Sequence, residues 1–207
     1  MAKNNSITLY GKVTTEPTYR STDKNGSDLY TFLITTENKT IKSGTVKVVG
    51  ESVLCCVYEK TNEFNVKNGD LVKITGTVLQ DHIDNYSSLC AFVEDIDFVK
   101  NIKLEDINTL QVLGTIYKNP PLLRELKNGS ERVTFLIENK ISPEDKFSMK
   151  LYTLAWNNLA HKIQELNFEV GDTVAIEGTL ISHKVTDPNT GNSYNLGEIL
   201  ARRVERA

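Results

Sequence analysis

Alternating hydrophobic and polar residues recur along most of the chain, in segments separated by turn-forming residues. Residues 7–14 and 29–36 alternate or are rich in β-branched and aromatic side chains, which is typical of strands. Residues 45–49, 71–79 and 89–99 follow the same pattern. Because successive side chains of a strand point to opposite faces, each segment has a core-facing side and an outward side. The pattern predicts a mainly β protein.

The strand pattern occurs twice. KNGSDLYTFLI, residues 24–34, returns as KNGSERVTFLI, residues 127–137. Gly11 matches Gly114 at the same separation of 103 residues, and GDLVKITGTVL later returns as GDTVAIEGTLI. A repeat of roughly 100 residues has the length of a domain, well above the ~20–50 residues of a solenoid repeat. The chain therefore contains two copies of one small domain.

One segment of each copy interrupts the run of strands. It is ESVLCCVYEKTN in the first copy and NNLAHKIQELN in the second. Leu159, Ile163 and Leu166 recur at spacings of four and three, which indicates a helix. We predict the order β-β-β-α-β-β in both copies. Five strands and one helix at this place fit the oligonucleotide/oligosaccharide-binding (OB) fold, a partly open barrel, whereas a plain β-sandwich leaves the helix unexplained.

The repeat also predicts where the two domains begin and end. We expect an N-terminal OB-fold at 1–100, a short linker at 101–108 and a C-terminal OB-fold at 109–207. The linker sequence KNIKLEDIN is charged and lacks Pro and Gly, so we expect the two barrels to be close neighbours.

Charge is nearly balanced in both halves. Residues 1–104 carry 12 Lys and Arg against 13 Asp and Glu, and the remaining residues carry 12 against 14. Neither half is a basic arm for nucleic acid, so anion binding requires a local patch.

Cysteine, histidine and acidic residues suggest no catalytic or metal site. Cys55, Cys56 and Cys90 are too few and too poorly spaced for a disulfide framework, and buried free thiols are the simpler interpretation. The three histidines lack metal-ligand spacing with Cys, and Asp95 and Asp97 alone do not make a two-metal nuclease. There is no phosphate-binding glycine loop. We expect no enzyme activity, no cofactor and no metal.

The sequence has no apolar leader at its N-terminus and no apolar run long enough to cross a membrane. A cytoplasmic location is therefore expected.

The second copy resembles the bacterial and phage single-stranded DNA-binding protein (SSB) family over residues 109–206. VLGTIYKNPPLLRELKNGSERVTFLIENK resembles the first two strands of that family, and KLYTLAWNNLAHKI its third strand and helix. VGDTVAIEGTLISHKVTDPNTGNSY and GEILARRV resemble the last hairpin and the closing strand. The resemblance implies sequence-independent binding of single-stranded DNA without catalysis. Tandem-barrel members of the family pair as homodimers with four OB-folds.

Three features depart from the family pattern. VKVVGESVL in the first copy places Val49 where Trp156 stands in the second. Hairpin positions that carry an aromatic in the family hold Ile83 and Val185. The chain ends in ARRVERA, so we do not expect the partner recruitment that an acidic tail provides.

Single-strand binding needs cations for the phosphates and flat rings that stack on bases. In the second copy, Lys150, Tyr152 and Trp156 share one face of the third strand, and Trp156 stands where the family has a stacking aromatic. Arg132 and Thr134 share a face of the second strand. The competing interpretation is a buried Trp156 and an ordinary surface Arg132.

Further candidates come from the first copy and from the hairpins. Arg20 and Arg124 precede the hairpin turns, and Lys184 and Tyr194 flank the loop TDPNTGNS. The candidates in the first copy are Tyr30, Thr31 and Lys47. For Tyr30, a core role and a binding role are equally open.

Two functions of different class therefore compete. The first is single-stranded DNA binding in replication, recombination or repair. The second is a protein–protein adaptor on the same fold, which the low net charge and the missing aromatics favour. An RNA-binding module would use the same stacking chemistry.

Overall fold

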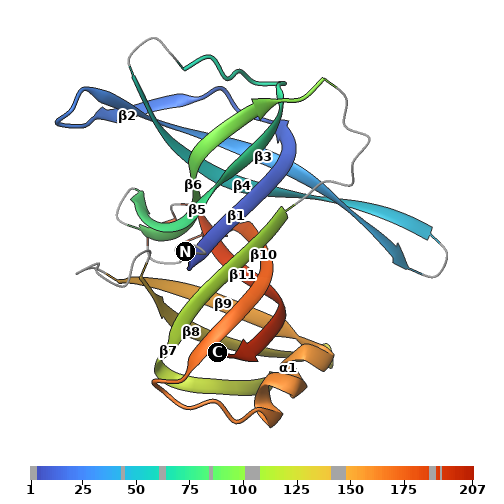
Figure 1. The fold of residues 1–207 in the computed structure, drawn as a ribbon. Coiled ribbons are helices and arrows are strands. Elements are labelled where there is room, and N and C mark those ends of the chain that lie inside the picture. Colours follow the sequence, from blue (N-terminus) through green and yellow to red (C-terminus); the bar gives the residue numbers. More distant parts are fainter. Residues whose placement is uncertain are drawn as a thin grey trace. The chain divides into compact units, whose positions relative to one another are not determined.

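The computed structural model describes residues 4–42, 45–60, 64–83, 86–100, 108–140, 148–186, 190–191 and 193–207 (Figure 1). Within these ranges, only the backbone is described for residues 37–51, 60, 81–87, 183–184 and 193–195, and the side chains of all other residues are described as well. The elements are β1 (Asn5–Val13), β2 (Thr18–Thr22), β3 (Ser27–Lys42), β4 (Thr45–Lys60), β5 (Leu71–Ile83), β6 (Tyr86–Phe98), β7 (Asn108–Glu125), β8 (Glu131–Asn139), β9 (Met149–Trp156), α1 (Asn157–Glu165), β10 (Thr173–Thr186) and β11 (Ser193–Arg206).

The chain forms two compact units. One contains residues 7–108 and 181–197, and we refer to it as the first barrel. The other contains residues 1–6, 109–180 and 198–207, and we refer to it as the second barrel. Most of the proposed linker, residues 101–107, lies outside the described residues.

Five strands close the first barrel. β1 pairs antiparallel with β3 and with β5, β3 pairs with β4, and β5 pairs with β6. A parallel pairing of β4 with β6 completes the circuit. This strand order is that of the OB-fold. The short β2 adds a hairpin to β3.

The second barrel repeats the same circuit. β7 pairs antiparallel with β8 and β10, β8 pairs with β9, β9 pairs parallel with β11, and β10 lies beside β11. The prediction of an all-β protein with two OB-folds is confirmed. The core of the second barrel contains the inward side chains of its strands, among them Ile137 and Leu151, which are fully buried.

The repeated Asn-Gly turns have the same backbone conformation in both barrels. Gly26 has φ 82° and Gly129 has φ 75°, which is the left-handed region that glycine adopts without a steric penalty. Each glycine lies in the turn that leads into the second strand of its barrel, β3 or β8. The sequence predicted this turn correctly.

The predicted helix is present in the second barrel and absent from the described residues of the first. α1 follows β9 and buries Ala160 and Ile163. Residues 51–60 instead continue β4, which pairs with β3 from Lys42↔Thr45 to Ser27↔Lys60 (Figure 1). Val53 and Cys55 are completely buried and Val57 is 3% exposed, so the segment has the period of a strand. The prediction of a helix in ESVLCCVYEKTN was wrong because β-branched, alternating residues favour a strand.

Candidate nucleic-acid interface

Three adjacent strands of the second barrel expose one continuous face, which we call the β7–β8–β9 face. In its first row, Arg124 lies opposite Arg132, and Arg132 lies opposite Trp156. Directly opposed residues of a sheet have their Cβ atoms ~4.5–5.5 Å apart on the same side. The sequence predicted these three residues as separate binding candidates, and the strand register places them in one row.

Three further rows continue this face. They are Leu122–Thr134–Leu154, Tyr117–Leu136–Tyr152 and Thr115–Glu138–Lys150. The register skips residues 118–121, which form an irregularity in β7. Predicted residues Thr134, Tyr152 and Lys150 therefore share the face with Trp156, as the alternation of β8 and β9 indicated.

The rings on this face are accessible. Tyr152 is 43% exposed and Trp156 is 36% exposed, whereas the intervening Leu154 is 7% exposed. Residues on the other side of the same strands, such as Val133 and Ala155, are completely buried. Trp156 is therefore not a core residue. A flat ligand can reach both rings, which is the requirement for stacking on a base.

Lys150 already has partners on this face. Its ammonium forms an ion pair with Glu138 and lies 3.9 Å from the centroid of the Tyr117 ring. Hydrogen bonds from Lys150 and from Ser148 lower the pKa of Glu138 below its ordinary value of 4.5. Lys150 thus anchors one end of the face, and a phosphate at this place would compete with the Glu138 carboxylate.

Arg132 has a different environment. Its Nε is buried and has no hydrogen-bond partner among the described residues. Arg132 lines a groove of about 760 Å³ together with Tyr117, Leu122, Arg124 and Tyr152. A guanidinium can contact phosphate or stack on a ring, and this one belongs to a side chain that lines the groove. The groove extends to Gln164 of α1, whose Oε1 accepts a hydrogen bond from the Leu123 amide at 3.0 Å.

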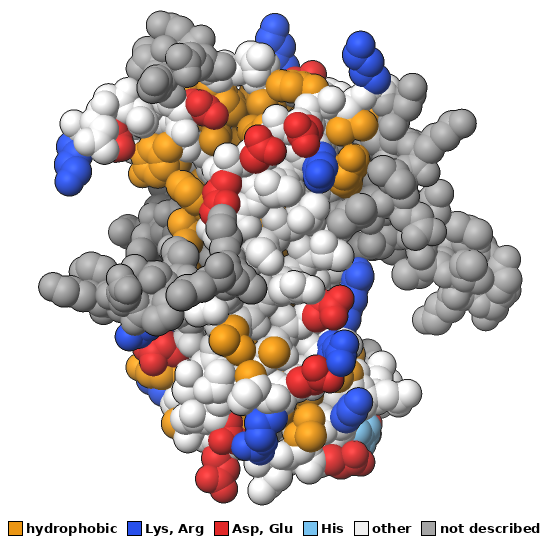
Figure 2. Space-filling view, viewed as in Figure 1, with side chains coloured by type: hydrophobic (Ala, Val, Ile, Leu, Met, Phe, Trp, Pro, Cys, Tyr) orange, Lys and Arg blue, Asp and Glu red, His pale blue; other side chains and the backbone are white. Residues whose placement is uncertain are grey.

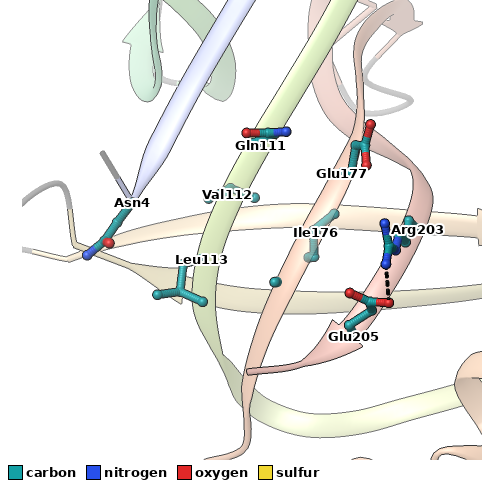
Figure 3. Close-up of a pocket in the computed structure, with 9 residues that line it drawn as sticks. Asn4, Gln111, Val112, Leu113, Ile176, Glu177, Arg203 and Glu205 are labelled. Atoms are coloured by element: carbon teal, nitrogen blue, oxygen red, sulfur yellow. Dashed lines mark hydrogen bonds and ion pairs between the residues drawn. The ribbon is translucent and has the colours of Figure 1, made fainter. Parts of the chain in front are cut away.

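A second hollow in this barrel, of about 230 Å³, contains none of the predicted binding residues (Figure 3). It is lined by Gln111, Ile176, Glu177 and Arg203 among others. Arg203 is already paired with Glu205 at 2.7 Å, and this hydrogen bond raises the pKa of the guanidinium. The guanidinium of Arg203 is therefore less available to an anion than that of Arg132.

In the first barrel the position equivalent to Trp156 is Tyr58, not Val49. Arg132 pairs with Trp156, and its repeat equivalent Leu29 pairs with Tyr58. The alignment at Val49 was wrong because β4 runs through the segment that had been assigned to a helix. Tyr58 is 43% exposed and its ring lies 6.0 Å from that of Phe92. The alternation of Val53, Cys55 and Val57 was the signal that could have found it.

The remaining candidates of the first barrel are less accessible or lie elsewhere. Arg20 Nε donates a hydrogen bond to Thr31 Oγ1 at 2.8 Å, and Thr31 is 4% exposed. Tyr30 pairs with the buried Val57 and stacks on Phe64 with ring centroids 4.7 Å apart. Tyr30 therefore contributes to the barrel interior beside Phe64 rather than to the outer face with Tyr58.

Three predicted residues have side chains outside the described part of the structure. They are Lys47, Lys184 and Tyr194, although their backbones lie in β4, β10 and β11. Lys47 pairs with Thr40 near the end of the β3–β4 ladder, far from Tyr58 along the strand.

Charges of both signs are interspersed on the visible face of the protein (Figure 2). This fits the formal net charge of −3. A ligand of this protein would therefore meet local cations rather than a broad basic surface.

Among the described residues, no helix has the length and hydrophobicity needed to cross a membrane, and no group of three His, Cys, Asp or Glu side chains is arranged to hold a metal ion.

Comparison with solved structures connects these barrels to known proteins. The chain superimposes over its full length on the wild-type single-stranded DNA binding protein from Thermus aquaticus, with TM-score 0.77, 20% identity and 94% of that chain covered. A deletion variant of the same protein gives TM-score 0.78, 18% identity and 96% coverage. The chain therefore has the same tandem OB fold as these two structures. No family model matches the sequence, and a search of curated proteins found no match.

The ion pair between Lys150 and Glu138 on the β7–β8–β9 face generates a pH prediction. Because the folded-state pKa of Glu138 is lowered, its stabilising contribution is present above about pH 4.5 and is lost as the pH falls through the folded-state pKa. Glu138→Gln should therefore be less stable than wild type near neutral pH and equal to it at acidic pH. Urea denaturation followed by Trp156 fluorescence over a pH series measures this.

The exposed strand-end variant Glu125→Gln is the matched control and should follow wild type at every pH. A stability difference for Glu138→Gln that persists below the folded-state pKa would contradict the electrostatic explanation.

Proposed function

We propose that this protein binds single-stranded DNA without sequence preference, using the β7–β8–β9 face, and that it is not an enzyme. The observation that carries the proposal is the row Arg124–Arg132–Trp156, with Tyr152 exposed on the same face. The similar solved structures are of a single-stranded DNA binding protein, which supports the proposal.

The chemistry follows from the residue types. Stacking of a base on an aromatic ring contributes ~1–3 kcal/mol and tolerates any base, because every base has a π-face. Trp156 and Tyr152 provide two platforms on one strand, while Arg132 and Arg124 provide cations one and two strands away. Bases would stack on β9 while the phosphates follow the arginines of β7 and β8.

The first barrel would extend the site. Tyr58 offers a platform at the position of Trp156, but the position of Arg132 is occupied by Leu29. Arg20 and Thr31 are hydrogen-bonded to one another, so they would contribute less than their counterparts. We retain Lys47, Lys184 and Tyr194 as proposed contacts from the hairpins.

In the cell the protein would coat exposed strands during DNA replication, recombination or repair, in the cytoplasm. An adaptor function is the second candidate, because Lys150 is held by Glu138 and the net charge is −3. An RNA module is the third, and oligo(U) in place of oligo(dT) separates it from the first.

Substitution of Trp156 tests the main site. Trp156→Ala should weaken binding of a labelled oligo(dT) by ~1–3 kcal/mol, or about 5- to 150-fold, because one stacking platform is lost. In the wild type, oligo(dT) should quench Trp156 fluorescence, and added salt should weaken binding as counterion release requires. Fluorescence anisotropy at low and moderate salt measures the affinities.

Phe98→Ala provides the control, because Phe98 is 51% exposed but lies on β6 of the first barrel. It should bind as wild type does. Absence of both quenching and binding at low salt would favour the adaptor.

The difference between the barrels gives a second prediction. Tyr58→Ala should weaken oligo(dT) binding less than Trp156→Ala, because no arginine lies opposite Tyr58 in its row. The same anisotropy titration ranks the two variants. If Lys47→Ala abolished binding while Trp156→Ala left it unchanged, the first barrel would be the main site and this assignment would be reversed.

We also propose that two chains associate as a homodimer with four OB-folds. Light scattering after size-exclusion chromatography should give twice the chain mass of 23.2 kDa. A mass of one chain across the accessible concentration range would contradict this.

A further inference from the structure

Two of the three cysteines lie in contact within the first barrel. The sulfur atoms of Cys56 on β4 and Cys90 on β6 are 2.8 Å apart. The structure has both residues as thiols and not as a disulfide, with 4% and 1% of their surfaces exposed. A disulfide bond is ~2.05 Å long, so a small movement separates this contact from a covalent bond.

The third cysteine is placed differently. Cys55 precedes Cys56 on the strand, so its side chain points to the opposite face of β4. Its sulfur lies 3.8 Å from the carbonyl oxygen of Val53, and burial raises the pKa of its thiol well above the ordinary value. The geometry therefore selects one pair from the three thiols.

The pair lies at the place where the first barrel closes. β4 and β6 are registered in parallel at Cys55↔Ala91 and Cys56↔Phe92, whereas the β3–β4 and β5–β6 ladders run along most of their strands. Parallel pairing is slightly less stable per residue than antiparallel pairing. The β4–β6 seam thus depends on little backbone hydrogen bonding and on its side chains.

We propose that Cys56 and Cys90 form a reversible disulfide that closes the β4–β6 seam. The oxidant would be a small-molecule disulfide such as oxidised glutathione. One cysteine thiolate attacks it, forming a mixed disulfide and releasing one glutathione thiolate. The second cysteine thiolate then attacks the protein sulfur of the mixed disulfide, forming the Cys56–Cys90 bond and releasing the second glutathione thiolate.

Burial determines how fast this exchange occurs. Because both sulfurs are almost completely buried, the first attack requires transient opening of the seam. The second attack needs no long-range movement, since the partner sulfur is in contact. Oxidation thus reports on opening of the first barrel.

The bond would also fix an aromatic pair of the outer face. Tyr58 and Phe92 each follow their cysteine by two residues, so they lie on the same sides of β4 and β6, with ring centroids 6.0 Å apart. In the second barrel the register places Leu154 and Glu198 at the positions of Cys56 and Cys90, so that seam cannot be closed in this way.

The test uses the full chain in glutathione buffers of increasing oxidising power, in the native state and after refolding from denaturant. Samples are quenched in acid, alkylated and mapped as peptides without reduction. We expect one intramolecular Cys56–Cys90 bond with Cys55 alkylated, and reversal by a dithiol. Amide hydrogen exchange in β4 and β6 should become slower in the oxidised protein.

Matched variants make the result specific. Cys55→Ser should still form the bond, whereas Cys56→Ser and Cys90→Ser should each lose it. Alkylation of both Cys56 and Cys90 in the most oxidising buffer, after refolding as well, would overturn the proposal, as would a bond that involves Cys55. The proposal rests on the seam geometry alone, so it can fail or hold independently of DNA binding.

Discussion

Closure of a five-stranded barrel is the constraint on which the rest of this structure depends. Once β7, β8 and β9 place one side of each strand in the core, their other sides must form a single outward face. Antiparallel register then decides which side chains meet on that face. Trp156 and Arg132 point outward because Ala155 and Val133, their neighbours in the chain, point to the opposite side and are buried, and the β7–β8 register adds Arg124 to the same row. The candidate binding site is therefore a consequence of how the core is packed.

The same constraint explains which predictions succeeded. Period-two alternation identified the strands and the outward position of Trp156, because Tyr152 and Trp156 alternate along β9 with the buried residues Thr153 and Ala155. The repeated KNGS motif located the same turn in both barrels, since glycine alone adopts that φ without strain. Partner registers such as Arg124 opposite Arg132 depend on the irregularity at residues 118–121 and could not be counted from one strand. Nor did the sequence indicate that Glu138 holds Lys150.

The helix predicted for the first copy shows how one local error propagates. Analogy with the second copy outweighed the alternation of Val53, Cys55 and Val57, which directly indicated a strand. Because the predicted third strand ended at residue 49, Val49 was aligned with Trp156 and Tyr58 was not among the predicted residues. An error in strand register affects the whole strand, because a shift along the ladder changes every residue pair at once.

Two barrels with one topology thus present different chemistry. The interior pattern is shared, because both circuits must bury an apolar side of every strand. The outward rows are free to differ, so Leu29 and Cys56 occupy the places held by Arg132 and Leu154 in the second barrel. The second barrel retains cations around its ring, whereas the first retains a ring without the adjacent arginine and gains a thiol pair at its seam. The two copies therefore differ in the outward rows and in the side chains of the closing seam, while the strand circuit is the same in both.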